Sequence, residues 1–277
     1  MSGVVGIFAR DGRPIESLDL QRMLAAIAHR GPDGSGVWLR GSTGLGHRML
    51  WTTPESLRER LPFADETGGL VITADARIDN REELIRLLDL EDRPRASISD
   101  SQLILRSYEK WGRRCPEKLL GDFAFAIWDS RLQAVFCARD HLGVKPFTYH
   151  SSERLFAFGS EIQAVLCAPV TPRRINEQRI ADYLVPIFED KSITLYQDIF
   201  RLPAAHRMTV WADRVEKDCY WSLDPSREMP ALSDGDYAEG FREIFSEAVR
   251  ARSRCPLPVG AMLSGGLDSS SIACSAR

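Results

Sequence analysis

The sequence has little that would place it in a specialised class of protein. Its six cysteines contain no Cys-x-x-Cys pair, so neither a disulfide framework nor a cysteine zinc site is indicated. There is no secretory signal pattern and no apolar run long enough to span a bilayer, so a cytoplasmic location is expected. The net charge of −3 gives no reason to expect a nucleic acid or a membrane as partner.

What is present is the composition and patterning of an α+β protein. Apolar residues make up 44% of the chain and charged residues 27%, as in ordinary globular domains. Runs of β-branched and aromatic residues predict strands at 3–9, 69–79, 122–129, 134–140 and 154–161, with a late hairpin about Ala212-Asp213. Helical spacing predicts helices within 17–30, at 80–88 with Asn80 as cap, at 99–112 with a Ser99-x-x-Gln102 capping box, and at 176–185. Sequential strands without βαβ units favour antiparallel sheets.

The character of the chain changes at 222–235, which reads as a linker between two domains. The first domain is predicted to cover 1–221. Residues 236–277 then predict a helix at 236–252, a strand at 257–263 and a loop that enters another helix. About forty residues are too few for an independent core, so the second domain is expected to be truncated.

The loop Ser264-Gly265-Gly266-Leu267-Asp268-Ser269-Ser270 carries a chemical signal of its own. Its glycines allow close backbone approach to a ligand, and the following helix directs N–H groups at an anion. Asp268 would repel a polyphosphate unless a cation such as Mg²⁺ lay between them. The alternative is an ordinary glycine turn before a capped helix.

Together with other stretches, this loop resembles the asparagine synthetase family. "HRGPDG" (29–34), "GDFAFAIWD" (121–129), "ARDHLGVKP" (138–146), "SEI" (160–162) and "VGAMLSGGLDSS" (259–270) occur in the family's order. The resemblance implies an Ntn-type αββα antiparallel sandwich, a class II glutamine amidotransferase domain, followed by the first helix, strand and pyrophosphate loop of an α/β parallel-sheet synthetase domain. It implies ATP and Mg²⁺ as cofactors and an AMP-forming ligase that activates a carboxylate. ATP and pyrophosphate would contact Met262, Ser264, Gly265, Gly266, Leu267, Asp268, Ser269 and Ser270, with Asp268 as the Mg²⁺ ligand.

The glutamine site implied by the same resemblance is altered in this chain. Ser2 stands where the family has a nucleophilic Cys, and a hydroxyl is the poorer nucleophile even beside a free α-amine left by removal of Met1. Asp75 replaces the Asn of the oxyanion hole, and Arg77 replaces the Glu that pairs with the substrate's ammonium. Arg48 and Asp100 are retained. The glutaminase is therefore expected to be inactive, and Asp75 and Arg77 are candidates to pair with each other across the vacated pocket.

The five histidines (His29, His47, His141, His150 and His206) show no metal-ligand spacing and are expected to pack or cap. Arg139, Asp140 and Lys145 are expected to hold a hairpin rather than touch substrate.

Four functions remain open from the sequence. The first is an ATP-dependent amide ligase that uses ammonia or a substrate's own amine, as the β-lactam-forming and lasso-peptide (macrolactam) relatives do. The second is an asparagine synthetase that converts aspartate to asparagine. The others are a non-catalytic docking module for a peptide or partner, and an N-terminal serine hydrolase. The expected partner is a small-molecule or peptide carboxylate; the oligomeric state is open, with a homodimer as one alternative.

Overall fold

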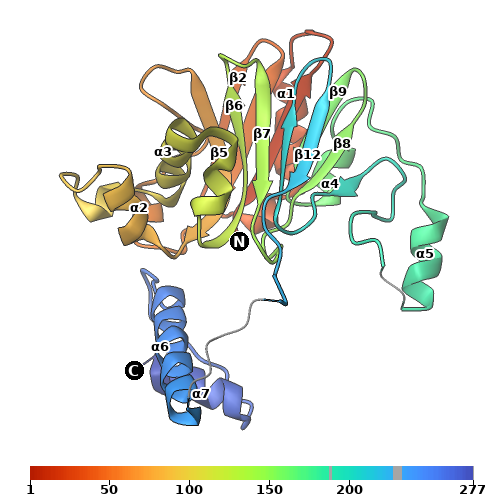
Figure 1. The fold of residues 1–277 in the computed structure, drawn as a ribbon. Coiled ribbons are helices and arrows are strands. Elements are labelled where there is room, and N and C mark those ends of the chain that lie inside the picture. The colour runs from red at the N-terminus through yellow and green to blue at the C-terminus, as the bar shows by residue number, and fades with distance from the viewer. Residues whose placement is uncertain (187–188, 227–232, 277) are drawn as a thin grey trace.

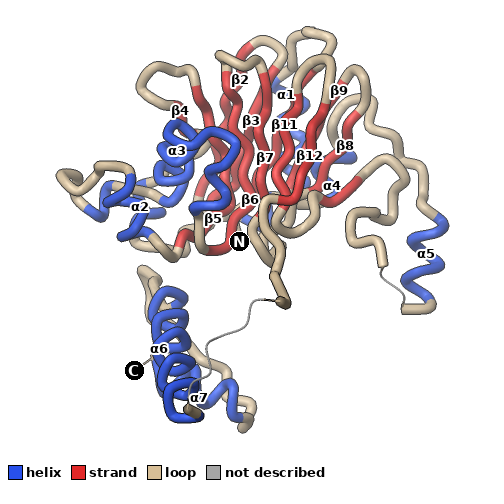
Figure 2. The backbone as a smooth tube through the Cα atoms, in the orientation of Figure 1, coloured by secondary structure: helices blue, strands red, loops and turns tan. Residues whose placement is uncertain are grey.

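The architecture is a sandwich of two antiparallel sheets covered on both outer faces by helices (Figures 1 and 2). The structure, a computed structural model, describes residues 1–186, 189–226 and 233–276, so residues 227–232 of the predicted linker lie outside it. One sheet has the order β10-β8-β9-β1-β3-β2, and the other has the order β12-β11-β7-β6-β5-β4. The predicted α+β class and Ntn-type sandwich are therefore confirmed.

The strands of the first sheet are β1 (Gly3–Ala9), β2 (Gly34–Arg40), β3 (Thr43–Met49), β8 (Thr148–Ser151), β9 (Leu155–Gly159) and β10 (Phe200–Arg201). Those of the second are β4 (Phe63–Ala64), β5 (Leu70–Ile78), β6 (Gly121–Asp129), β7 (Ala134–Arg139), β11 (His206–Val210) and β12 (Val215–Cys219). The α-helices are α1 (Ser17–Ala26), α2 (Arg81–Leu87), α3 (Asp100–Trp111), α4 (Ile162–Leu166), α5 (Glu177–Leu184), α6 (Asp234–Arg252) and α7 (Leu267–Ser275). None of the helices in these described segments is long and apolar enough to cross a membrane.

Strand β1 shows why the apolar run at the N-terminus is continuous. Val4 and Phe8 point between the two sheets, where they join a core that includes Trp128 of β6. Val5 and Ile7 point the other way, into a core shared with α1 and α4. Because both faces of the strand are buried, both residue sets are apolar. A third core lies under α2 and α3 on the outer face of the second sheet.

The sequence patterns located most of these elements, and the hairpin turning at Ala212-Asp213 is formed by β11 and β12. The β2–β3 hairpin was not predicted. β2 alternates only between half-buried and exposed residues, and β3 contains Gly44 and Gly46, so neither has a strong apolar period. At the start of α3 the predicted capping box is present.

Two local predictions were wrong. Asn80 stands at the N-cap position of α2 but makes no side-chain cap; its Oδ1 instead accepts from the Leu120 backbone N–H at 2.9 Å. Residues 257–263 form no strand, because no described strand lies beside them to supply hydrogen-bond partners. The helix predicted at 236–252 is α6, but its apolar face is open: Phe241 is 70% exposed and Ile244 71% exposed.

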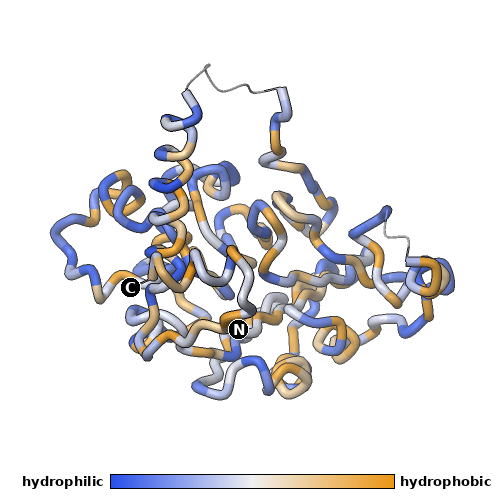
Figure 3. The backbone as a smooth tube through the Cα atoms, turned by 90° about the horizontal axis from the view of Figure 1, so that it is seen from below, coloured by the Kyte–Doolittle hydropathy of each residue, from blue (hydrophilic) through white to orange (hydrophobic). Residues whose placement is uncertain are grey.

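The N-terminus and helices α6 and α7 lie toward one end of the sandwich. Figure 1 places the N-terminus at the lower end of the strands, on the side where α6 and α7 lie, and Figure 3 views the molecule from that end. The predicted glutamine-site residues on β5 lie at the same end, next to the part of the chain that contains α6 and α7.

Candidate active site

Ser2 is buried at the start of β1, and its hydroxyl is engaged with the chain after β3. Its Oγ accepts the backbone N–H of Leu50 at 3.0 Å and can donate to the Leu50 carbonyl at 3.4 Å. The α-amine in the structure belongs to Met1, and burial lowers the pKa of this amine while nearby Asp75 opposes that shift. The Ser2 hydroxyl is thus held by the Leu50 backbone and lies beside the Met49 sulfur, and no basic side chain among the described residues hydrogen-bonds to it.

Asp75, on β5, is 3% exposed and is paired with two cations. Its carboxylate lies 2.8 Å from Lys145 Nζ and 3.4 Å from Arg30 Nη2. Arg30 also donates to the Ser2 carbonyl at 2.9 Å and pairs with Glu161 at 3.0 Å. Asp75, Arg30, Lys145 and Glu161, which we call the Asp75 cluster, therefore join two carboxylates to two cations beside Ser2.

Arg77 lies two residues further along β5 and does not pair with Asp75, contrary to the prediction. The two side chains share a face of a regular strand, since β5 pairs with β6 without interruption from Leu70 to Ile78. Arg77 instead lies 3.7 Å from Asp79 and donates to the Ala251 carbonyl at 2.5 Å. Burial lowers the pKa of Arg77 and raises that of Asp79. The negative charge of Asp75 is already balanced by two nearer cations, so Asp75 attracts the Arg77 guanidinium only weakly.

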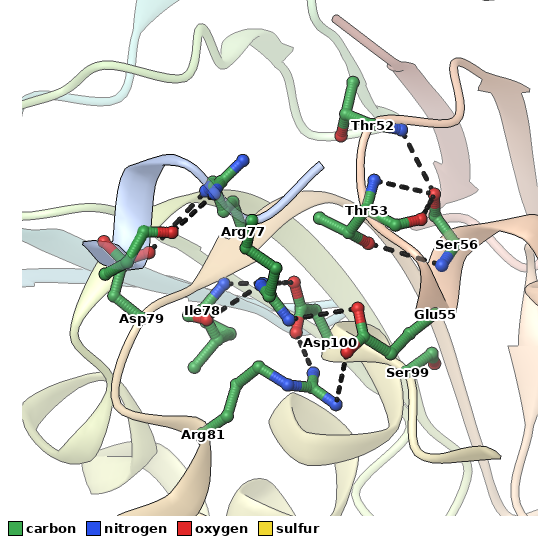
Figure 4. Close-up of polar contacts among 12 residues, drawn as sticks. Thr52, Thr53, Glu55, Ser56, Arg77, Ile78, Asp79, Arg81, Ser99 and Asp100 are labelled. Atoms are coloured by element: carbon green, nitrogen blue, oxygen red, sulfur yellow. Dashed lines mark hydrogen bonds and ion pairs between the residues drawn. The ribbon is translucent and has the colours of Figure 1, made fainter. Parts of the chain in front are cut away.

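Asp100, at the start of α3, accepts from the backbone N–H of Ile78 at 3.1 Å and pairs with two arginines. Arg81 contacts one carboxylate oxygen, and Arg254 lies 2.9 Å from the other. Glu55 also contacts both arginines, at 3.6 Å from Arg81 and 3.1 Å from Arg254. Figure 4 shows Glu55 and Asp100 facing the guanidinium of Arg81. We call Glu55, Arg81, Asp100 and Arg254 the Arg254 cluster.

Arg48, the position implied to take the glutamine carboxylate, is turned to α1, where its Nε donates to the Leu24 carbonyl at 3.0 Å. The structure therefore places Arg48, Asp75, Arg77 and Asp100 around one end of β5 and β3 but binds each of them to a group of the protein. Two carboxylates balance two cations in the Asp75 cluster, and the same holds in the Arg254 cluster. An arriving ammonium or carboxylate would have to displace a partner that is already in place.

The other three members of the Asp75 cluster could have been found from the sequence. Arg30, Lys145 and Glu161 lie in the quoted "HRGPDG", "ARDHLGVKP" and "SEI" stretches, so the family motifs were the signal that could have found them. Arg139 donates to three backbone carbonyls and Asp140 accepts from loop N–H groups, so both hold the hairpin as expected. The expectation was wrong for the Lys145 side chain, which leaves the hairpin and pairs with Asp75. Glu55 and Arg254 had no such signal, because they meet only in the folded chain.

The histidines are packed or bonded to backbone and side chains. His150 and His206 each bond a carbonyl through Nδ1, at 2.8 Å, and His29 lies 3.0 Å from Glu161. His47 bonds Thr73, and His141 packs edge-on against aromatic rings such as Tyr220. Within the described segments, no group of three or more His, Cys, Asp or Glu side chains could hold a metal ion.

The loop before α7 lies apart from these clusters and is exposed. Gly265 has φ +80°, a conformation that favours glycine, and this turn brings the hydroxyls of Ser264 and Ser269 within 3.0 Å. No side chain caps α7 at Gly266, so its first N–H groups remain available for an anion. Asp268 and Met262 are exposed, Met262 by 95%. The donor set fits a polyphosphate; a Mg²⁺ on Asp268 would need phosphate oxygens and water as its other ligands.

Comparison with known proteins identifies two family regions in the chain. A family model described as glutamine amidotransferase domain matches residues 1–221, and one described as asparagine synthase matches residues 240–277. Asparagine synthetase [glutamine-hydrolyzing] 3 of Bacillus subtilis is 30% identical over 93% of this chain and 42% of its own length. Amidase chry2 of Gibberella zeae is 30% identical over 92% of this chain and 38% of its own. The chain thus spans about half the length, or less, of these relatives.

Solved structures support the fold. Glutamine phosphoribosylpyrophosphate amidotransferase from B. subtilis superposes with a TM-score of 0.58 at 15% identity, over 80% of this chain and 50% of that one. This likeness shows an Ntn amidotransferase fold. With the family match over 1–221 and relatives named asparagine synthetase, the chain belongs to the glutamine amidotransferase domain family, in its asparagine synthetase-like form.

Proposed function

We propose that the chain is the amidotransferase-like part of an ATP-dependent, AMP-forming amide ligase whose glutaminase site is inactive. The nitrogen comes from free ammonia or from an amine already present in the substrate, as in the closure of a macrolactam. The observation that carries this proposal is the internal pairing of the glutamine site, where Asp75 and Asp100 are each held by two cations of the protein.

The residues at the Ser2 site are unsuited to amide hydrolysis for three reasons. The hydroxyl of Ser2 is a weak nucleophile, and the hydrogen bond that its oxygen accepts from the Leu50 N–H weakens it further. Asp75 is a carboxylate where a developing oxyanion needs a donor, so it repels the charge that should be stabilised. Arg77 is a cation at the position of the family's Glu that pairs with the substrate's ammonium, and its guanidinium is held by Asp79 and the Ala251 carbonyl.

The ligase half of the proposal is supported by the asparagine synthase match over 240–277 and by the loop geometry. When bound, ATP would supply the activation of the substrate carboxylate. Ser264, Ser269 and the free N–H groups of α7 would hold the pyrophosphate portion, and Asp268 would bind Mg²⁺. Met262, exposed just before the loop, would lie near the adenine. A cytoplasmic location and a small-molecule or peptide carboxylate as acceptor belong to the same proposal.

The names of the relatives favour a second candidate, an asparagine synthetase that acts on aspartate. The two candidates share the ATP site and differ in the acceptor and in the nitrogen source. Asparagine formed from aspartate and ammonia would favour the second; activation of a peptide carboxylate would favour the first.

The test is glutamate production from L-glutamine, measured for the wild type, Ser2→Cys, and the triple variant Ser2→Cys/Asp75→Asn/Arg77→Glu. We expect no enzyme-like rate from the wild type or from Ser2→Cys, because both charge conflicts persist in each. Only the triple variant restores a nucleophile, an oxyanion donor and an ammonium partner together; Ala76→Gly is added if the backbone must turn. Thermal melts of each variant exclude unfolding as the cause of inactivity. Glutamate release by the wild type, or by Ser2→Cys alone, would refute the proposal.

A further inference from the structure

Polar contacts attach the end of α6 to the N-terminal domain, while most of the helix's apolar face is open. Phe241 and Ile244 on its apolar face are 70% and 71% exposed, and Val249 is the only residue of α6 that is buried. The described contacts to the sandwich come from the last turn and the residues after it. An exposed helix of this kind draws little stability from its own sequence, so these contacts hold it in place.

Arginines supply these contacts. Arg252 pairs with Asp79 at 3.2 Å and bonds Asp122 at 2.8 Å. Its pKa is raised, chiefly by the hydrogen bond to Asp122. Arg77 donates to the Ala251 carbonyl, the last-turn acceptor of the helix.

The Arg254 side chain is more deeply buried against the N-terminal domain than the Arg252 side chain. One of its Nη atoms contacts Glu55, and the other contacts both Asp100 and the Ile78 carbonyl, the latter at 3.1 Å. Its side chain is 20% exposed, against 47% for that of Arg252. Without Arg254, Glu55 and Asp100 would share one guanidinium, that of Arg81, in a site where Asp100 is 5% exposed. An unbalanced buried carboxylate is costly, so the site requires a second cation.

We propose that the Arg254 cluster is a guanidinium-binding site that docks the end of α6 onto the amidotransferase-like domain. Asp100 of this cluster belongs to the implied glutamine pocket. The Arg254 side chain that contacts it therefore occupies part of the space that a free amino acid would need. The domain thereby serves as a platform for the segment that follows it. This inference does not depend on ATP chemistry or on the nitrogen source, so it can fail or hold separately from the proposed function.

The test is hydrogen exchange, followed by mass spectrometry, over residues 234–254 of the full chain. We expect Arg254→Gln to speed exchange in the last two turns of α6 at least tenfold, because the helix end is released. Arg250→Gln is the matched control, because Arg250 is exposed near the same end of the helix and lies outside the cluster. In this variant, hydrogen exchange in the last two turns of α6 should stay within twofold of the wild-type rate. Near-ultraviolet circular dichroism of both variants monitors the sandwich. Equal exchange in Arg254→Gln and the wild type would overturn the proposal.

A second measurement tests the chemistry of the site rather than the presence of a contact. In Arg254→Ala, tens of millimolar guanidinium chloride, far below denaturing concentrations, should slow exchange of the helix end at least threefold by filling the vacated site. Sodium chloride at the same ionic strength should speed exchange or leave it unchanged, because salt screens charge pairs. Equal effects of the two salts would show that no guanidinium site exists.

Discussion

Among single residues, Asp75 is a buried carboxylate at a position where an oxyanion hole needs a hydrogen-bond donor. The structure adds that Lys145 and Arg30 neutralise it, so the substituted carboxylate is built into the domain. Replacing Asp75 with the Asn that glutamine hydrolysis would need removes the carboxylate partner of two largely buried cations, Lys145 and Arg30, and such an uncompensated buried charge is destabilising.

His47 shows how a buried residue sets the response to pH. Its Nδ1 lies 3.2 Å from the Thr73 hydroxyl, which itself donates to the Gly46 carbonyl, so Nδ1 carries the proton. Its Nε2 is buried without a hydrogen-bond partner among the described residues. Burial lowers the pKa of His47 from 6.5 to about 3. Below pH 6.5 the His47 imidazole thus binds a proton in the unfolded state but stays neutral in the folded state.

We predict that this difference reduces the free energy of unfolding as the pH falls. Because the folded pKa is depressed, the contribution is complete above pH 6.5 and is lost as the pH falls toward 3; between pH 7.5 and 5 the loss is about 2 kcal/mol. Urea denaturation at several pH values measures it. His47→Gln should be less stable at pH 7.5 but should show a shallower pH dependence. An unchanged slope in this variant would assign the pH response to other groups.

Among the strands, the glycine in the middle of β1 is required by the side chain on the neighbouring strand β9, where Phe158 lies directly opposite Gly6. A Cβ on Gly6 would lie 2.3 Å from ring carbons of Phe158, which is fully buried and stacked on Phe147. A Cβ on Gly34 of β2 would meet only the Cβ of Met49, at an ordinary 3.5 Å. Both residues are strand glycines, so the difference lies entirely in packing.

We therefore predict that Gly6→Ala lowers the free energy of unfolding by about 1–3 kcal/mol, the usual cost of overpacking a core. Gly34→Ala, the matched control, should change it by less than about 0.5 kcal/mol. Chemical denaturation of the two variants against the wild type is the measurement. Equal stabilities would mean that Phe158 can move aside at no cost, which its stacked position argues against.

At the scale of the whole molecule, the second segment lacks the neighbours that its sequence pattern calls for. Residues 257–263 have the apolar character of a parallel strand but pair with no described strand. Leu267 and Met262 at the nucleotide loop are 87% and 95% exposed. A nucleotide site at the edge of a parallel sheet needs that sheet to position the loop.

We predict that the 277-residue chain alone shows no sustained pyrophosphate release when supplied with ATP, Mg²⁺ and aspartate or a candidate peptide. In a protein of the relatives' full length, release should be measurable, and Asp268→Ala should reduce it about a hundredfold or more because a charge-neutralising ligand is lost. The measurement in both cases is the rate of pyrophosphate release. Sustained pyrophosphate release by the 277-residue chain would show that its nucleotide loop is already active. Normal release by the Asp268→Ala variant would show that Asp268 has no part in catalysis.

The sandwich, its main strands and helices, and the altered glutamine-site residues could be predicted from the amino-acid sequence. Apolar periodicity and family motifs are local properties of the chain, so they can be recognised without knowledge of the fold. The partners of those residues depend on how distant parts of the chain meet in the folded protein. Lys145 lies 70 residues from Asp75, and Arg254 lies 154 residues from Asp100, so the folded chain as a whole brings these pairs together. The tertiary structure also decided that 257–263 is not a strand, because a strand depends on a neighbour that its own sequence does not specify.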